Sequence, residues 1–260
     1  MRATAVSRSI MIAFKVVIPA RYASSRLPGK PLADIGGKSL IQRVYDQGLK
    51  AACLKDLIVA TDDQRILEHV LGFGGQAVLT SDKHRSGTER CKEAVLIWNE
   101  GHPGPWEVVI NIQGDEPFIS PGQIDLVGEL LSEPGTDIGT LVKKISDLTE
   151  LTDPNVVKVV LNRYGDAMYF SRSAIPYLRD KNPEEWTSHQ TYYKHIGIYG
   201  YKSDILVRLP ELYPTEAEIA ESLEQLRWLS YGLKIRTRVT ETESISIDTP
   251  SDLLKITNIT

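Results

Sequence analysis

Three cationic side chains lie within the ten residues 21–30 of this chain, in the segment Pro19–Leu32. Arg21, Arg26 and Lys30 are joined by small residues, which let backbone N–H groups approach an anion. Arginine offers a planar pair of donors to phosphate oxygens, and lysine adds a compact charge. The spacing matches neither a Walker P-loop nor the G-x-G-x-x-G fingerprint. The segment therefore predicts a phosphate site of another kind, and the alternative is a solvated basic turn.

A second polar group occupies Asn111–Pro117, after another apolar run. Asp115 follows Gly114, so the backbone can turn sharply there and present the carboxylate over a site. A hard cation such as Mg²⁺ takes oxygen ligands, often one or two protein carboxylates beside substrate phosphates. This segment predicts a magnesium ligand at Asp115. The alternative is that Asp115 and Glu116 only form a turn before the next helix.

A third acidic position follows the short apolar run Ile245–Ile247, which we expect to be the last strand of the sheet. Asp248 comes directly after it and precedes Thr249-Pro250. Taken alone, Asp248 is typical of a helix N-cap. Together with Asp115 it could hold a cation from the opposite side.

Isolated polar residues elsewhere could complete a ligand cleft. Ser86 and Gly87 begin a predicted helix, whose N-terminus favours an anion. Others lie inside apolar stretches or on a late helical segment: Arg172, His195, Tyr199, Glu224 and Gln225. The alternatives are ordinary ones, a structural histidine and the hydrated side of a helix. The histidines lack metal-ligand spacing, and no nucleophile–base triad is evident.

The elements that must position these residues alternate in type along the first half of the chain. Short apolar runs typical of buried strands occur at 14–20, 57–61, 77–80 and 108–112, and helical patterns separate them. This alternation predicts an α/β fold with a mostly parallel central sheet flanked by helices. Ligands of such sheets bind beyond the carboxyl ends of the strands, where the first two polar groups occur.

After residue 135 the pattern becomes richer in strands. Strand-like runs occur at 138–145, 156–162, 167–170 and 196–201, with a predicted hairpin turn at 163–166, and a helix is expected over 219–231. We find no repeat and no linker that would separate two units. We therefore predict one domain over residues 13–256, preceded by a loose extension at residues 1–12.

Composition and charge exclude several classes of protein. The 260 residues are 42% hydrophobic and 25% charged, which excludes a disordered or low-complexity chain. The net charge of −4 argues against a nucleic-acid coat, and no apolar run is long enough for a membrane span. Residues 1–50 carry nine Lys or Arg against two acids, whereas residues 101–142 carry seven acids and no Lys or Arg. The two cysteines, Cys53 and Cys91, favour a reducing, cytoplasmic setting.

The order and spacing of these motifs resemble the 3-deoxy-manno-octulosonate (Kdo) cytidylyltransferases, or CMP-Kdo synthetases, over nearly all of residues 14–256. The continuation Arg26–Leu32 points to this branch and not to the related sialic-acid enzymes. The segments that carry the resemblance are Pro19–Leu32, Arg85–Arg90, Gln113–Pro117, Ser171-Arg172, His195–Tyr199, Glu221–Arg227 and Asp248-Thr249-Pro250.

The resemblance implies a nucleotide-diphospho-sugar-transferase-like fold with a smaller β-rich part for dimerisation and sugar binding, and usually a cytoplasmic homodimer. It implies that CTP and Kdo react, with Mg²⁺, to CMP-Kdo and pyrophosphate for lipopolysaccharide biosynthesis. The partners are then these two small molecules, with neither nucleic acid nor membrane.

Site roles follow by the same resemblance. The implied catalytic residues are Arg21, Lys30, Asp115 and Asp248, of which Asp115 and Asp248 would bind Mg²⁺. The implied nucleotide-binding residues are Pro19, Ala20, Arg21, Arg26, Lys30, Ser86, Gly87 and Gln113. The sugar would contact Gln113, Arg172, His195, Tyr199, Glu224 and Gln225.

One segment departs from the family pattern. Residues 213–221, Tyr-Pro-Thr-Glu-Ala-Glu-Ile-Ala-Glu, are unusually acidic for a surface that faces a sugar acid. A related substrate such as 8-amino-Kdo therefore stays open, as does a solvated loop with unrelated acids. Two other hypotheses are a cytidylyltransferase for sialic acid or another sugar, and a non-catalytic nucleotide-binding regulator.

Overall fold

The computed structural model describes residues 13–23, 27–52, 54–102, 106–243, 245–247, 249 and 251–253. The predicted extension at residues 1–12 lies outside this range. The main strands are β1 (Phe14–Ala20), β4 (Leu54–Thr61), β5 (Ala77–Leu79), β6 (Val108–Asn111), β7 (Ile138–Ile145), β8 (Lys158–Leu161), β9 (Ala167–Ser171), β10 (Tyr192–Lys202) and β11 (Ile235–Val239). The helices are α1 (Leu40–Gly48), α2 (Gln64–Gly72), α3 (Gly87–Gly101), α4 (Pro121–Ser132), α5 (Leu148–Thr152), α6 (Trp186–His189), α7 (Ser203–Arg208), α8 (Glu216–Glu221) and α9 (Glu224–Ser230).

In the described part of the chain these nine strands form one sheet. Its order is β11-β7-β10-β6-β1-β4-β5, with β8 pairing β10 and β9 pairing β8; the short strands β2 (Asp34–Ile35) and β3 (Lys38–Ser39) pair separately. Strand β1 runs parallel to both β4 and β6, and β4 runs parallel to β5. The carboxyl ends of β1 and β6 therefore meet at one edge. The predicted α/β fold is confirmed.

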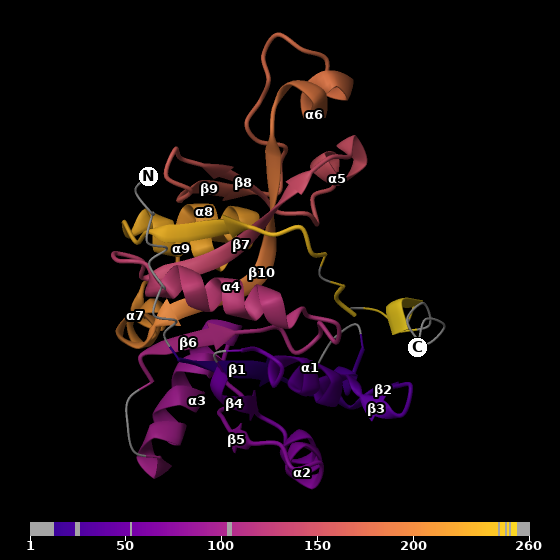
Figure 1. Ribbon diagram of the computed structural model, residues 1–260, viewed down its shortest axis with the longest axis vertical. Coiled ribbons are helices and arrows are strands. Elements are labelled where there is room, and N and C mark those ends of the chain that lie inside the picture. Colours follow the sequence, from indigo (N-terminus) through magenta and orange to yellow (C-terminus); the bar gives the residue numbers. More distant parts are fainter. Residues whose placement is uncertain are drawn as a thin grey trace, which may run out of the picture.

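The core lies on both faces of this sheet, as the alternation along β1 shows. Phe14, Val16 and Ile18 pack on one face with α1, α2 and α4, whereas Val17 packs on the other face with α3, α7 and α9 (Figure 1). Strands that are buried on both faces have continuous apolar runs because each side chain meets a covering helix. The result is a three-layer arrangement that holds the strand ends rigidly.

The β-rich part is mostly antiparallel, with β11 running parallel to β7. Strand β10 pairs antiparallel with β6, β7 and β8, and β8 forms a hairpin with β9. Gly165 has a φ of +80°, which suits the tight turn of that hairpin, as predicted. Figure 1 shows this hairpin near one end of the molecule, together with α5 and α6, and β5 and α2 at the other end.

Two local predictions are wrong. The helix expected over 219–231 is divided into α8 and α9 because Ser222 adopts a left-handed conformation with a φ of 53°. The run 245–247 is not a strand. The backbone N–H of Ile247 instead donates to the carbonyl of Asp115 at 2.9 Å, in the loop after β6, where no strand is available to pair with.

No helix among the described residues is both long and apolar enough to cross a bilayer.

Packing of α4 on β1 generates a stability prediction. A Cβ at Gly128 would lie 2.5 Å from the ring of Phe14, which is fully buried. We expect Gly128→Ala to lower the free energy of unfolding by about 1–3 kcal/mol, the usual effect of overpacking. Gly122→Ala in the same helix is the control, since its nearest neighbour is Ser120 Oγ at 3.6 Å. Urea unfolding measures both; equal stability of the two variants would contradict this packing.

Candidate functional site

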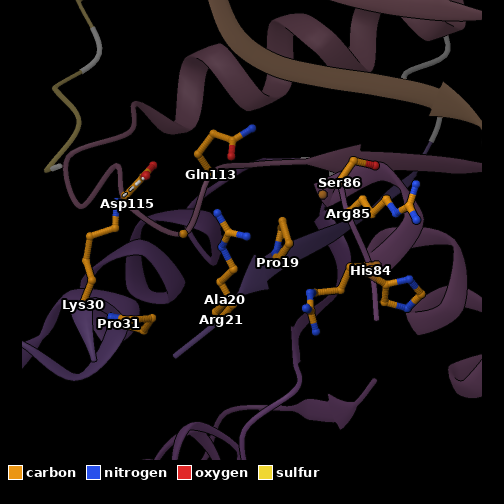
Figure 2. A pocket seen from close by; sticks show the side chains of 13 residues that line it. Pro19, Ala20, Arg21, Lys30, Pro31, His84, Arg85, Ser86, Gln113 and Asp115 are labelled. Atoms are coloured by element: carbon orange, nitrogen blue, oxygen red, sulfur yellow. Dashed lines mark hydrogen bonds and ion pairs between the residues drawn. The ribbon is translucent and has the colours of Figure 1, made fainter. Parts of the chain in front are cut away.

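A cavity of about 290 Å³ lies where β1 and β6 end and α3 begins. Figure 2 shows Lys30 and Asp115 on one side of it, His84, Arg85 and Ser86 on the other, and the Arg21 guanidinium between them. Its walls are built from the basic loop after β1, the loop before α3 and the loop after β6. The lining residues are Pro19, Ala20, Arg21, Lys30, Pro31, His84, Arg85, Ser86, Gly87, Arg90, Gln113, Gly114 and Asp115.

Lys30 reaches this cavity through a glycine turn. Gly29 has a φ of +70° and precedes the single 3₁₀ turn Lys30–Leu32. The Lys30 ammonium donates to Asp115 Oδ2 at 2.7 Å and to the carbonyl of Ile247 at 2.8 Å. One partly buried cation therefore joins three segments that are far apart in the sequence.

Asp115 is placed by close backbone approach. A Cβ at Gly114 would lie 2.8 Å from the carbonyl oxygen of Pro19, so only glycine fits between the two loops. The Asp115 side chain, 28% exposed, then reaches Lys30 at the cavity. Its carboxylate is the kind of oxygen donor that Mg²⁺ prefers.

The side chains here fit a metal site that a bound nucleotide completes better than a site made of protein ligands alone. Among the described residues, no three His, Cys, Asp or Glu side chains form a group that could hold a metal. A magnesium held by one or two carboxylates and by nucleotide phosphates needs no such group. Asp115 meets that requirement, and Asp248, the other predicted ligand, lies outside the described residues.

On the α3 side of the cavity, Ser86 caps the helix. Its hydroxyl accepts from the Glu89 N–H at 3.2 Å. Four residues after Ser86, and hence on the same helix face, Arg90 also lines the cavity. Arg90 is 4% exposed and donates to Asp62 at 2.7 Å and to Thr80 at 2.6 Å. The sequence interpretation missed Arg90, although its i+4 spacing from Ser86 could have identified it.

His84 and Arg85 also line the cavity without having been predicted to bind. His84 Nε2 is hydrogen-bonded to the carboxylate of Glu93, which also accepts the Ser81 N–H at 2.8 Å. Arg85 is exposed. Arg85, together with Arg21, Lys30 and Arg90, gives the cavity lining more cations than its one acid, Asp115, which favours an anionic ligand.

The nucleotide residues predicted from the sequence therefore come together. Pro19, Ala20, Arg21, Lys30, Ser86, Gly87 and Gln113 all line this one cavity, as does Asp115, the predicted metal ligand. Arg26 lies outside the described residues.

The predicted sugar residues of β10, His195 and Tyr199, do not line the cavity. Gln113 Nε2 donates to the carbonyl of Gly197 at 3.1 Å, which ties the cavity to β10. On that strand, His195 Nε2 is bonded to the Thr140 hydroxyl at 3.0 Å. Burial lowers the pKa of His195 to about 4, so the imidazole is neutral at pH 7. The buried Tyr199 ring lies 5.1 Å from it.

Of the remaining predicted sugar residues, Glu224 and Gln225 are the first residues of α9, and Arg172 contacts the end of α8. Glu224 accepts from Ser86, a cavity residue, at 3.2 Å, and Gln225 is buried. Arg172 is more remote: its guanidinium donates to the carbonyls of Glu221 at 2.7 Å and Pro154 at 3.0 Å.

Two acids of the segment 213–221 form ion pairs or hydrogen bonds with other residues of this chain. Glu218 pairs with Arg227 at 3.1 Å. The Glu221 carboxylate accepts from the Ser171 hydroxyl at 2.6 Å and from the Arg172 N–H at 2.8 Å. These contacts account for two of the acids as structural.

The fold and the cationic strand-end cavity define a nucleotide-binding α/β protein. A family model described as cytidylyltransferase matches residues 15–235. The 3-deoxy-manno-octulosonate cytidylyltransferase of Parabacteroides distasonis is 52% identical over 94% of this chain and 97% of its own. That of Cytophaga hutchinsonii is 49% identical over 95% and 97%. The chain thus belongs to the cytidylyltransferase family, in its 3-deoxy-manno-octulosonate branch.

Solved structures agree. A CMP:2-keto-3-deoxy-manno-octonic acid synthetase complexed with CTP is 41% identical, with a TM-score of 0.86 over 95% of this chain and 98% of that one. A putative glucose-1-phosphate thymidylyltransferase from Bacillus anthracis, 18% identical with a TM-score of 0.63 over 95% of each chain, shares the fold alone.

Proposed function

We propose that this chain transfers CMP from CTP to Kdo, giving CMP-Kdo and pyrophosphate. The observation that carries the proposal is the strand-end cavity in which Arg21, Lys30 and Asp115 meet. The similarity to a synthetase complexed with CTP supports it, because that structure matches nearly the whole chain.

In this proposal the anomeric hydroxyl of the sugar attacks the α-phosphorus of CTP in line. The new bond joins the sugar oxygen to phosphorus, the bond from the α-phosphorus to the bridging oxygen of the pyrophosphate breaks, and the hydroxyl proton passes to solvent. Arg21 and Lys30 neutralise the charge on the departing pyrophosphate, which fixed cations stabilise without reorganisation. Pro19, Ala20, Ser86 and Gly87 bind the nucleoside end, and Arg26 assists at the phosphates.

Mg²⁺ would be held by Asp115 and Asp248; when bound, it would neutralise phosphate charge and acidify the sugar hydroxyl. The contact of residue 247 with Lys30 and Asp115 supports a role for the next residue at the same place. Lys30 orients the Asp115 carboxylate in the structure as it stands.

For the sugar, we propose contacts with Gln113, Arg172, His195, Tyr199, Glu224 and Gln225. Kdo is favoured over 8-amino-Kdo because Glu218 and Glu221 already bind cationic or N–H partners of the chain. We further propose that the enzyme acts in the cytoplasm, where CTP is made, and supplies CMP-Kdo for lipopolysaccharide biosynthesis. The buried free thiol of Cys91 suits that reducing compartment.

The proposed activity has a direct test. We expect the purified chain to release pyrophosphate from CTP with Mg²⁺ and Kdo, and to do so far more slowly with 8-amino-Kdo or sialic acid. A coupled pyrophosphate assay over these three acids measures it. Release with sialic acid but not with Kdo would assign another substrate, and CTP binding without release from any acid would favour a non-catalytic regulator.

A carboxylate-to-amide substitution tests the metal role of Asp115. We expect Asp115→Asn to raise the Mg²⁺ concentration for half-maximal turnover by about 10- to 100-fold, the range for disrupted metal environments. Asp46→Asn is the matched control, since Asp46 pairs with Lys38 at the surface. Initial rates over a magnesium titration measure both variants. An unchanged magnesium requirement in Asp115→Asn would exclude Asp115 as a ligand.

We also propose that the chain forms a homodimer through the hairpin β8–β9. Within the described chain, β9 forms a strand ladder with β8 alone, and its other edge meets β11 only at its start, through the bridge between Asp166 and Arg236. Met168 and Tyr169 on this strand, and Tyr164 in the turn, are 60%, 41% and 69% exposed. An exposed edge with apolar side chains favours pairing with another chain.

A charged residue introduced on β9 tests whether the chain dimerises through this hairpin. We expect the unmodified chain to sediment as a dimer at micromolar concentration and Met168→Glu to shift it toward monomer, because a carboxylate resists burial. Leu71→Glu is the control, as Leu71 is 54% exposed on α2, toward the other end of the molecule (Figure 1). Sedimentation equilibrium distinguishes the states. A dimer unaffected by Met168→Glu would place the interface elsewhere.

A further inference from the structure

The N-terminal turns of α3 and α9 are joined by one carboxylate. Thr88 Oγ1 donates to Glu224 Oε2 at 2.8 Å, and Ser86 Oγ donates to Glu224 Oε1 at 3.2 Å. The same Ser86 hydroxyl caps α3 by accepting the Glu89 N–H. Both oxygens of Glu224 are therefore held by the helix whose first residues line the nucleotide cavity.

Thr88 differs from Ser86 in its surroundings. It is 3% exposed and does not line the cavity, whereas Ser86 does. Its hydroxyl donates a hydrogen bond to Glu224. A buried hydroxyl without a hydrogen-bond partner would destabilise the fold, because its lost hydration would not be replaced. Glu224 is also held from its own helix, where Arg227 donates at 3.0 Å.

We propose that Thr88 is a positioning residue, which fixes the Glu224 carboxylate against the start of α3 and so couples the nucleotide cavity to the sugar side of the site. This inference rests on the proposed function for the identity of the two ligands. The coupling itself follows from the contacts: a shift of Glu224 moves the cap of α3, and a shift of that cap moves Glu224.

The charges around Glu224 make the coupling measurable. Arg227 on α9 and Glu218 on α8 face it, and Tyr199 and Tyr201 on β10 and Cys91 on α3 lie within its electrostatic reach. Burial raises the pKa of Glu224, whereas the hydrogen bonds from Thr88 and Ser86 and the charge of Arg227 lower it. Loss of the Thr88 hydroxyl therefore raises that pKa further.

The sign of the pH effect follows. Ionised Glu224 accepts both hydroxyl hydrogens, and protonation as the pH falls weakens this hold. An increase in the pKa of Glu224 shifts the loss of function on the acid side to higher pH. A role of Thr88 in packing alone would lower activity at every pH and leave the acid limb where it is.

The experiment compares Thr88→Val, which removes the hydroxyl at similar volume, with Thr88→Ser, which keeps it. The first measurement is kcat/KM for Kdo against pH at saturating CTP; the second is CTP affinity against pH by calorimetry without sugar. In Thr88→Val we expect the acid limb to move up by about half a pH unit or more, and KM for Kdo to rise about fivefold, equivalent to one lost hydrogen bond. Thr88→Ser should restore both.

Each other outcome is decisive. Superimposable pH profiles for Thr88→Val and the unmodified chain would overturn the proposal, and so would a uniform loss with an unshifted acid limb. If the unmodified chain binds CTP but releases no pyrophosphate, the proposed function fails, and the CTP affinity profiles alone decide the role of Thr88. Absence of CTP binding by the unmodified chain would overturn both.

Discussion

The contact between the Lys30 ammonium, the Asp115 carboxylate and the carbonyl of Ile247 determines the geometry of the whole site. It joins the loop after β1, the loop after β6 and the segment near the end of the chain. The Lys30 side chain is only 13% exposed, so both charges lose much of their hydration. A partly buried ion pair adds little net stability because desolvation offsets the attraction. Its value here is positional: breaking it would leave a charge uncompensated at the point where the phosphates are expected.

The sheet beneath this contact provides the rigidity that such a site requires. Strands β1 and β6 are buried on both faces, and Gly114 lets the loop after β6 pass directly over Pro19. Arg90 is fixed in the same way, by Asp62 and Thr80 at the ends of neighbouring parallel strands. Cations held on packed elements need no rearrangement when an anion arrives, which is the condition for electrostatic stabilisation of a transition state.

The sequence allowed the meeting of these polar residues at one strand-end cavity to be predicted, because parallel strands bring polar residues at their carboxyl ends to one edge. Arg21, Lys30, Gln113 and Asp115 all follow such strands. Arg90 was missed although it lies four residues after Ser86; the contacts with Asp62 and Thr80 that fix it come from other segments of the chain. The division of the late helix at Ser222 was missed as well, since a left-handed serine has no sequence signal comparable to glycine. Arg26 and Asp248 remain predictions.

The two halves of the site communicate through cavity residues. Gln113 donates to β10 beside His195 and Tyr199, and Ser86 donates to Glu224 on α9. In the function proposed above, a nucleotide that displaces Gln113 or Ser86 would disturb the sugar side, and by linkage a bound sugar would alter nucleotide affinity to the same extent. The division at Ser222 matters for this reason. A continuous helix over 219–231 would direct its residues along one axis. The left-handed turn instead starts a new helix, α9, at Glu224, whose side chain contacts the first turn of α3. A break that local helix propensity does not favour is thus what brings the carboxylate to the nucleotide cavity.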